Sequence, residues 1–454
     1  MNLKLAGAVA IGISALALTA CGGGGDGGST TGTTSTVSPT PTVTMSFDQP
    51  KLAVGQTAKL TWTTTNATSC VASGAWSGTQ ATAGTSTQTA STAGQSVFTL
   101  ACTGPGGSAT QSATMMVPLP VQKTSYLNKV VAAAAIGSQP LPAEVAQGNA
   151  VAFADFFQEG TYSMVTHSLE YTYGDPSTQN KFGHIHFWKS VNGQWVDHTA
   201  DILASNTGCL HPRKALVADF NGDGKPDVFF ACHGYDGAPF PGEQPHYLLS
   251  QADGTYKNVT APTTCFCHSA SAADFSGNGY ADVVVVDNIV HGKPYFLIND
   301  KNGSFAEDLT RLQNTIARGA PIFTAELIDF GRSQYDVFLS GDEQNGWNPT
   351  IVQNDGTEHF STTKTLAVDA YFTNTLDVLF VNGQVYLNRV HVGSTGTSYG
   401  FSEIQKVDYN TTAASQIYTN TANFSNGMTW LNWIAPYNGK IVSLDSTYGV
   451  SVPQ

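Results

Sequence analysis

The 454-residue sequence is poor in charge, and poorest in positive charge. Only 12% of its residues are charged, and 20 Lys and Arg against 33 Asp and Glu give a net charge of −13. A nucleic-acid-binding protein needs clustered basic side chains to neutralise phosphates, and the sequence has no basic stripe, so we predict no nucleic-acid partner. The catalytic motif HExxH is also absent, and no catalytic residue is assigned.

The N-terminus has the pattern of an export signal. Lys4 precedes an apolar run at 5–18, which is shorter than the roughly 20 residues that a membrane-spanning helix needs. The next residues, Leu18-Thr19-Ala20-Cys21, resemble the bacterial lipobox, whose cysteine is lipidated. We therefore predict a lipoprotein signal peptide at 1–21 with lipidation at Cys21; the alternative is an ordinary signal peptide with a chance cysteine.

The residues after Cys21 indicate location and a tether. Gly22 stands where an Asp would favour inner-membrane retention, so we predict lipid anchoring at the cell outer membrane, with a periplasmic or surface-exposed body. Residues 22–41 carry one charged residue and almost nothing to bury, which predicts a disordered Gly/Ser/Thr tether. The anchor is the only expected contact with the membrane.

Six further cysteines form an even set in an exported chain, which indicates disulfides. The spacing favours Cys70–Cys102 and makes Cys209–Cys232 plausible. Cys265 and Cys267 leave three options open: a strained, reducible bridge, cross-pairing, or metal binding together with His268.

Abundant glycine and short runs of Thr, Val, Ser and aromatic residues predict an all-β protein. From 42 to 118 the residues alternate as in strands, with Leu60 and Trp62 on one face. The stretches LTWTTTNATSC and LACTGPGGSAT resemble bacterial Ig-like domains, which implies a small β-sandwich whose sheets a disulfide pins together across the core. We interpret this segment as a spacer, and 119–146 as a linker with the first strand of the next domain.

A repeat begins near residue 147, and its copies align on an aspartate followed by an aromatic-rich hairpin. The copies begin at Asp155, Asp219, Asp274, Asp329 and Asp369, and a sixth, eroded copy begins near residue 422. About four strands per copy predict a six- or seven-bladed β-propeller over 147–454, with an open stack as the alternative.

Two copies place oxygen-bearing groups at alternate positions of a Gly-containing turn. Such oxygens can converge on one Ca²⁺ ion, which prefers six to eight oxygen ligands. The ligands would be Asp219, Asn221, Asp223, Lys225 (through its carbonyl) and Asp227, and in the next copy Asp274, Ser276, Asn278, Tyr280 and Asp282. The alternative is an Asx-turn without an ion.

The stretches ADFNGDGKPDVFF and ADFSGNGYADVVVV resemble the FG-GAP/VCBS repeat of integrin-type propellers. This resemblance implies strand–loop–strand calcium sites at both turns, with the second site weaker. The copies at Asp155, Asp329 and Asp369 depart from the pattern, and we predict ion-free turns there.

Polar residues around the best-preserved copy are the first candidates for a ligand site. His211, Arg213, His233 and Asp236 lie near the predicted calcium turn in the sequence. Loop-placed aromatic rings offer a second route to sugar or protein binding, although blade packing is the alternative for each; they include Tyr171, Tyr173, Trp188, Tyr235, Phe240, Trp347 and Trp430.

The sequence favours a surface-displayed, calcium-stabilised binding or adhesion lipoprotein over an enzyme. The expected ligand is an extracellular glycan, matrix component or protein, and no organic cofactor is expected. Two alternatives stay open: a polysaccharide-active or other hydrolase on a propeller scaffold, and a structural component of an envelope complex.

Overall fold

Strands make up nearly all of the regular structure in the computed structural model, which describes residues 37–128, 142, 150–312, 316–392, 399–420, 434–443 and 451–453. The all-β prediction is confirmed. Helical structure in the described residues is confined to a turn at 125–128 and to η1 (Pro176–Thr178), α2 (Thr199–Ile202) and η3 (Glu343–Asn345). Within these residues, no helix has the length and apolar character needed to cross a membrane.

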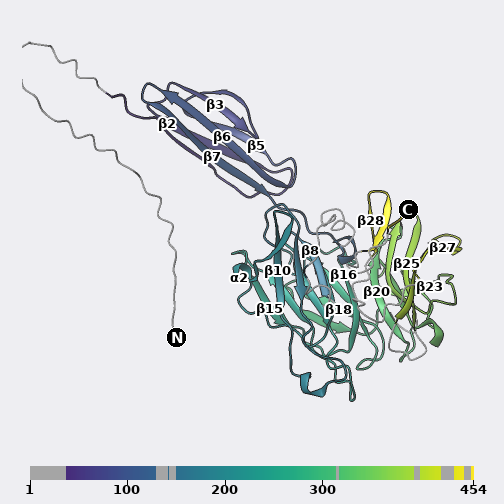
Figure 1. Ribbon diagram of the computed structural model, residues 1–454. Helices are drawn as coiled ribbons and strands as arrows, with labels where there is room; N and C mark the ends of the chain where they lie inside the picture. The colour runs from purple at the N-terminus through teal and green to yellow at the C-terminus, as the bar shows by residue number, and fades with distance from the viewer. Residues whose placement is uncertain are drawn as a thin grey trace, which may run out of the picture.

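The N-terminal strands form two sheets that share one core (Figure 1). Every second residue of β2 is buried from Ala58 to Trp62, as the alternating sequence predicts. The sheets have the orders β1-β2-β5 and β4-β3-β6-β7, built from β1 (Thr42–Phe47), β2 (Thr57–Thr65), β3 (Ser69–Gly74), β4 (Gly78–Gln80), β5 (Gly84–Thr89), β6 (Gly94–Gly104) and β7 (Gly107–Val117).

The Cys70–Cys102 disulfide is present, but the expectation that it pins two sheets together is wrong. Cys70 on β3 is directly opposite Cys102 on the neighbouring strand β6 of the same sheet. Trp62 lies on the other sheet and contacts the same core. A sequence separation of 32 residues suits neighbouring antiparallel strands as well as strands of facing sheets, so spacing alone did not distinguish them.

The rest of the chain forms consecutive antiparallel sheets, the blades of a β-propeller. Each of the first five has four strands in sequence order, and the last described sheet has three. The strands are β8 (Ala150–Ala154), β9 (Ser163–His167), β10 (Ile185–Val191), β11 (Gln194–Asp197); β12 (Pro212–Ala218), β13 (Asp227–Cys232), β14 (His246–Ser250), β15 (Tyr256–Thr260); β16 (Cys267–Ala273), β17 (Asp282–Asp287), β18 (Tyr295–Asn299), β19 (Phe305–Asp308); β20 (Ile322–Ile328), β21 (Asp336–Gly341), β22 (Thr350–Asn354), β23 (Phe360–Thr365); β24 (Asn374–Val381), β25 (Gln384–Val392), β26 (Tyr399–Asp408), β27 (Ala414–Asn420); and β28 (Ile434–Tyr437), β29 (Lys440–Ser443), β30 (Ser451–Pro453).

The first strands of successive blades contact one another, from β8 through β12, β16, β20 and β24 to β28. The second strands are buried along their whole length, because neighbouring blades cover both faces. Continuous apolar runs such as VVVV in β17 therefore replace the alternation seen in β2. Between first strands, Lys214 Nζ lies 2.7 Å from Glu326 Oε1, and Ser271 donates to Glu326 Oε2 at 2.9 Å.

The segment predicted to be a linker with a first strand, 119–146, is described only at 119–128 and 142. Its described part, up to residue 128, holds no strand but a helical turn that crosses several first strands. Thr124 Oγ1 donates to Leu327 O at 3.0 Å, Asn128 Nδ2 donates to Val217 O at 2.5 Å, and Tyr126 OH accepts from Phe380 N at 2.6 Å. Each bond satisfies a polar group near the centre of the array.

The repeat alignment holds for four copies and fails for the fifth. Asp155, Asp219, Asp274 and Asp329 each begin the turn between the first and second strands of a blade. Asp369 instead lies in the connection from β23 to β24, and the corresponding turn is Asn382-Gly383 between β24 and β25. A loose match to the aspartate spacing had produced the wrong register. The start of the sixth copy, 422–433, lies outside the described residues.

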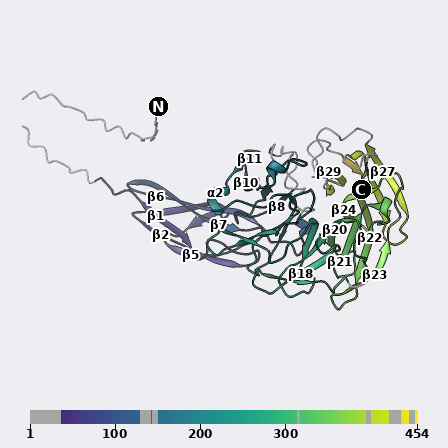
Figure 2. The same ribbon diagram turned by 90° about the horizontal axis from the view of Figure 1, so that it is seen from below.

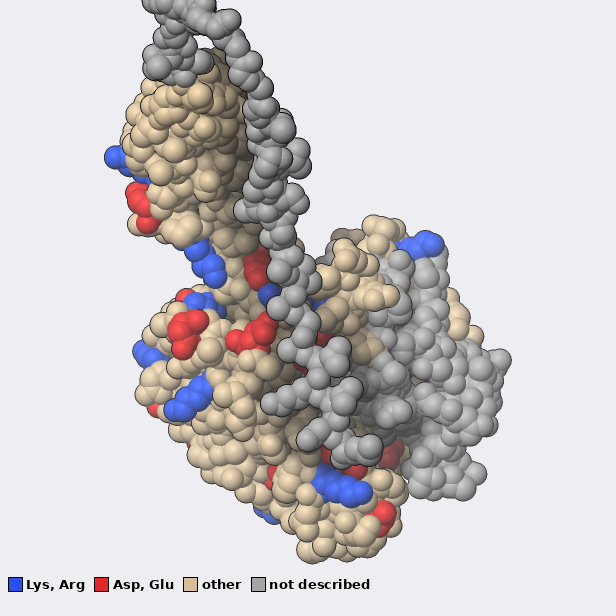
Figure 3. Space-filling model, turned by 60° about the vertical axis from the view of Figure 1, so that its left-hand side comes forward, with Lys and Arg blue, Asp and Glu red and all other residues tan. Residues whose placement is uncertain are grey.

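The sandwich joins the propeller at the end that carries the acidic turns (Figures 1 and 2). Leu119 N donates to Asp155 Oδ2 at 2.9 Å. Gly160 in the same turn packs so closely on the sandwich that an added Cβ would lie 2.3 Å from Gly94 Cα. On the face shown in Figure 3, acidic and basic side chains are interspersed among the coloured residues, without a continuous basic patch.

Candidate functional site

The turn at 219–227 is organised by two carboxylates that accept backbone N–H groups. Asp219 accepts from Gly222 N at 2.7 Å and from Gly224 N at 2.8 Å, and both glycines have φ of +76°. Asp227 is fully buried and accepts from Phe220 N at 2.8 Å and from Ser250 N at 2.7 Å. The second of these bonds ties the start of β13 to the end of β14.

Charge is poorly compensated in this turn. Burial raises the pKa of Asp227 to about 7. Burial also raises the pKa of Asp219, and the Asp223 carboxylate adds to that rise. Lys225 Nζ lies 3.5 Å from Asp223, but no basic group of the described residues pairs with Asp227.

The second turn repeats this arrangement. Asp282 Oδ1 accepts from Asn299 N at 2.8 Å, and burial raises the pKa of Asp282 to about 7. Ser276 Oγ, at a predicted ligand position, is buried without a hydrogen-bond partner among the described residues. Asp274 accepts from Asn278 N and Gly279 N, and Asn278 Oδ1 accepts from Tyr280 N.

The fourth turn shows how the chain neutralises the same carboxylate with its own cation. Asp336 Oδ1 accepts from Asn354 N at 2.9 Å, as Asp227 accepts from Ser250 N. Arg332 extends from the turn to Asp336, with 2.7 Å between Nη1 and Oδ1. In the first blade Ser163 takes the position of the buried aspartate, and the only buried carboxylate of that turn among the described residues is Asp155.

Acidic oxygens without a protein cation, together with a buried serine hydroxyl lacking a partner, suit a hard cation such as Ca²⁺. In the arrangement described here the carboxylates serve backbone N–H groups, and the turns are not among the groups of three ligand side chains brought within 4.8 Å of one another. The residue types of both turns therefore fit Ca²⁺. The hydrogen bonds observed within the turns are those of the Asx-turn alternative, in which the Asp side chains accept backbone N–H groups.

The predicted ligand-site residues come together, but not beside the acidic turn. His211 precedes β12 and His233 follows β13, so the length of the hairpin, about 20 Å, separates them from Asp219. Their proximity to the calcium turn is one of sequence only, because a seven-residue strand carries the chain to the opposite end of the blade. This second end also carries the loops 168–184, 233–245 and 288–294.

Two buried imidazoles, of His211 and His233, and the half-buried imidazole of His268 form the centre of this end. The ring centroids of His211 and His233 are 4.8 Å apart, and those of His233 and His268 are 4.6 Å apart. Burial lowers the pKa of all three histidines well below the ordinary value, and the charge of Arg213 adds to this for each. The rings are therefore neutral near pH 7 and have lone pairs available.

Aromatic rings and an acid surround the imidazoles. Tyr171 packs on His211 with ring centroids 5.5 Å apart, and Phe266 packs on His233 at 3.5 Å. Asp236, in the loop after β13, is half-buried, and desolvation raises its pKa while Arg213 opposes the rise. One ligand atom each from His211, His233 and Asp236 lies within 4.8 Å of the other two.

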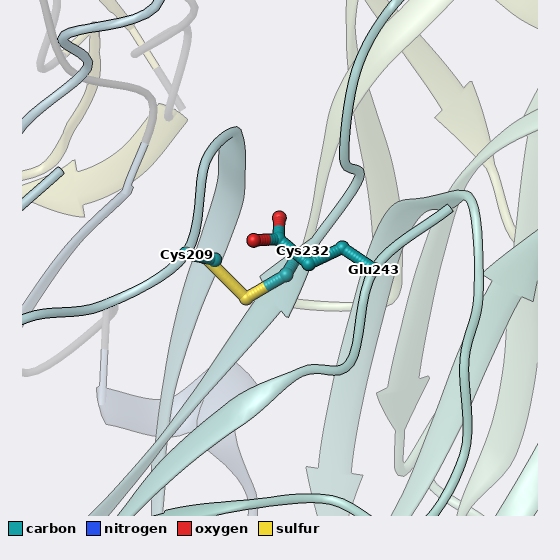
Figure 4. Close-up of side chains that lie close together, drawn as sticks. All are labelled: Cys209, Cys232 and Glu243. Atoms are coloured by element: carbon teal, nitrogen blue, oxygen red, sulfur yellow. A yellow bond between two sulfur atoms is a disulfide. The ribbon is translucent and has the colours of Figure 1, made fainter. Parts of the chain in front are cut away.

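Disulfides bracket this cluster. The predicted Cys209–Cys232 bridge is present, and Cys265 is joined to Cys267 and not cross-paired. Figure 4 shows the Glu243 carboxylate beside the Cys209–Cys232 bridge. Glu243 accepts from Leu210 N at 2.6 Å, and burial raises its pKa to about 7.

Sequence reasoning assigned no site role to Glu243 and considered His268 only as a partner of the cysteines. A signal for His268 was present: Cys267-His268 repeats the dipeptide Cys232-His233 at the same end of the neighbouring blade. Glu243 has no such signal, because its role depends on how the loop 233–245 folds back onto Leu210.

A comparison with protein families supports the repeat identified in the sequence. Residues 219–285 match the FG-GAP-like repeat, a range that contains both predicted calcium turns. No curated protein matches the chain.

Three solved structures share a low degree of similarity with the chain. A lectin from Agrocybe aegerita that recognises non-reducing terminal N-acetylglucosamine has a TM-score of 0.30 and 19% identity over 47% of this chain and 51% of its own, so the chain spans about half the length of that lectin. A quinonprotein alcohol dehydrogenase-like protein from Bacteroides thetaiotaomicron has a TM-score of 0.30 and 9% identity, covering 83% and 94%. An exotype rhamnogalacturonan lyase has a TM-score of 0.34 and 12% identity, covering 90% and 89%. At these scores, the ligands and activities of those proteins are not transferred to this chain.

The buried carboxylates predict an unusual pH dependence in the presence of chelator. A folded-state pKa of about 7 for Asp227, against an ordinary 3.8, means that the folded protein holds a proton which the unfolded chain releases. This contribution to stability is full below about pH 4 and is lost as the pH rises through 7. Between pH 4 and 7, the free energy of unfolding of D227N should therefore rise relative to wild type by more than about 1 kcal/mol.

Urea unfolding in chelator at several pH values measures this difference. Asp253→Asn, at an exposed carboxylate whose pKa is lowered, is the matched control and should leave the difference constant over this range. A D227N curve parallel to wild type would contradict the assignment of a protonated Asp227.

Proposed function

We propose that this protein is a lipid-anchored, calcium-stabilised binding protein of the outer membrane, whose propeller recognises an extracellular glycan or protein. In this proposal Cys21 carries the lipid, residues 22–41 form the tether, and an Ig-like sandwich acts as the stalk. The observation that carries the proposal is the set of exposed apolar and aromatic side chains on the loops of the end away from the stalk.

These side chains come from three separate loops. Tyr173 is 69% exposed, Phe182 43% and Phe240 37%, and the neighbouring loop adds exposed Ile289 and Val290. Exposed rings beside polar groups are the residue types that stack on sugars or anchor protein ligands. Because the stalk joins the opposite end, the tether would direct these loops away from the membrane.

Ligand binding tests the central claim. The full-length protein, presented to arrays of glycans and matrix proteins, should retain at least one ligand without degrading it. Y173A and F240A should each weaken that binding about 10-fold or more, since an anchoring ring contributes more than about 1.4 kcal/mol.

Val71→Ala, at an exposed apolar residue of the sandwich, is the matched control and should bind as wild type does. Binding that is unchanged in both ring variants would contradict this use of the loop end. Breakdown of the ligand would favour the hydrolase alternative.

Calcium stabilisation is tested separately. A site with a dissociation constant of about 0.1–1 mM, typical of extracellular modules, adds only about 0.4–1.4 kcal/mol at 1 mM Ca²⁺. Calcium should therefore raise the thermal midpoint of wild type slightly, and the rise should shrink in D219N but persist in D253N. An identical rise in D219N and wild type would refute a site at this turn.

The lipid anchor is tested in cells. Cys21→Ser should abolish incorporation of a labelled fatty acid and shift the protein from the membrane to the soluble fraction, whereas Thr30→Ser, in the tether, should change neither. A C21S protein that remains labelled and membrane-bound would exclude the lipobox assignment.

A further inference from the structure

We propose that His211, His233 and Asp236, with His268 as a fourth ligand, form a binding site for a zinc-type divalent metal ion. The site is separate from the acidic turns, and it goes beyond the proposed binding of glycan or protein ligands. It rests on the convergence of imidazole nitrogens, on the long contact between two of them, and on the disulfides that hold the ligands.

The ligand atoms already converge. One atom from each of His211, His233 and Asp236 lies within 4.8 Å of the other two. Nε2 of His233 and Nε2 of His268 are 3.4 Å apart. Two nitrogens bound tetrahedrally to zinc at about 2.0–2.1 Å would lie about 3.3–3.4 Å from each other, so the distance between this pair already suits a shared ion.

Protein groups alone satisfy these rings incompletely. A hydrogen bond between the two Nε2 atoms would use one ring as donor and the other as acceptor, at a long 3.4 Å. Nδ1 of His268 would still be buried without a partner among the described residues. A metal ion at the two Nε2 atoms would replace this long contact with two full bonds, while Nδ1 of His268 would keep its proton.

His233 has the second contact expected of a metal ligand. Its Nδ1 lies 3.4 Å from the backbone oxygen of Gly234, which favours the tautomer with a lone pair on Nε2. The carboxylate of Asp236 would supply negative charge against the ion. Two or three imidazoles and one carboxylate are a ligand set typical of zinc and related first-row metals, in contrast to the all-oxygen set of the acidic turns.

The disulfides fix the ligand backbone. His233 directly follows Cys232, His268 directly follows Cys267, and His211 lies two residues after Cys209. The backbones of two ligands are also bonded to each other, since His233 N donates to His211 O at 2.9 Å. Phe266 and Phe323 pack on the His268 ring, with centroids 5.4 and 5.0 Å from its own. Such rigid support is what a preorganised metal site requires.

Calorimetric titration with Zn²⁺ tests the proposal. The full-length protein is stripped of metal and returned to buffer with 1 mM Ca²⁺, so that any calcium sites are filled. Wild type should bind one Zn²⁺ per chain. Losing a contact outside the ligand shell already costs 10–100-fold in affinity, so H233Q should lose more than about 100-fold.

The controls separate ligation from folding. His198→Gln removes a histidine that pairs with Asp201 at 2.8 Å away from the cluster, and it should bind Zn²⁺ as wild type does. D219N should also bind normally. D236N alters a half-buried loop carboxylate and serves if H233Q fails to fold; it should weaken binding about 10-fold or more. Thiol titration verifies that the cysteines are oxidised, so that thiolates do not bind the zinc.

Failure of folded wild type to bind Zn²⁺ would overturn the proposal. Equal affinities of wild type and D236N would overturn it as well, as would equal affinities of folded H233Q and H198Q. Loss of binding in D219N together with retention in H233Q would place the ion at the acidic turn instead.

Discussion

A buried carboxylate at the start of the second strand organises each well-preserved blade. Asp227, Asp282 and Asp336 each accept the backbone N–H of the residue that ends the third strand, at 2.7, 2.8 and 2.9 Å. This bond closes the central hairpin of the blade at one edge, where a backbone donor would otherwise be buried without a partner. Strand order, turn length and the packing between blades all accommodate it.

Burying a carboxylate has an electrostatic cost, and the blades meet it in different ways. The fourth blade supplies Arg332 from its own turn, and the first replaces the acid with Ser163. The second and third blades retain the acid without a paired protein cation among the described residues, and their carboxyl pKa values are raised to about 7. In these two blades a cation from solution would stabilise the ionised form of the buried carboxylate.

The two ends of the propeller are thereby specialised. At one end, short glycine turns pack against each other, as Ala281 N bonded to Asp219 O at 3.0 Å shows, and the first of them also holds the sandwich. At the other end, longer loops are held by two disulfides, and they carry both the histidine cluster and the exposed rings. The contacts between neighbouring turns lie at one end of the propeller. The loops at the other end can therefore differ in sequence and length without disturbing the blades.

The sequence by itself determined the all-β class and the acidic turns between the first and second strands of four blades, because these depend on residues close together in the chain. It also indicated two of the disulfides, from an even number of cysteines and their spacing. It did not determine that Cys70 and Cys102 share one sheet, or that Asp369 lies in a connection between blades, because spacing alone does not fix strand pairing. Only the tertiary structure separated His211 and His233 from Asp219 and brought His268 beside them. A strand moves two sequence neighbours to opposite ends of a blade, whereas packing between blades joins residues that are far apart in the chain.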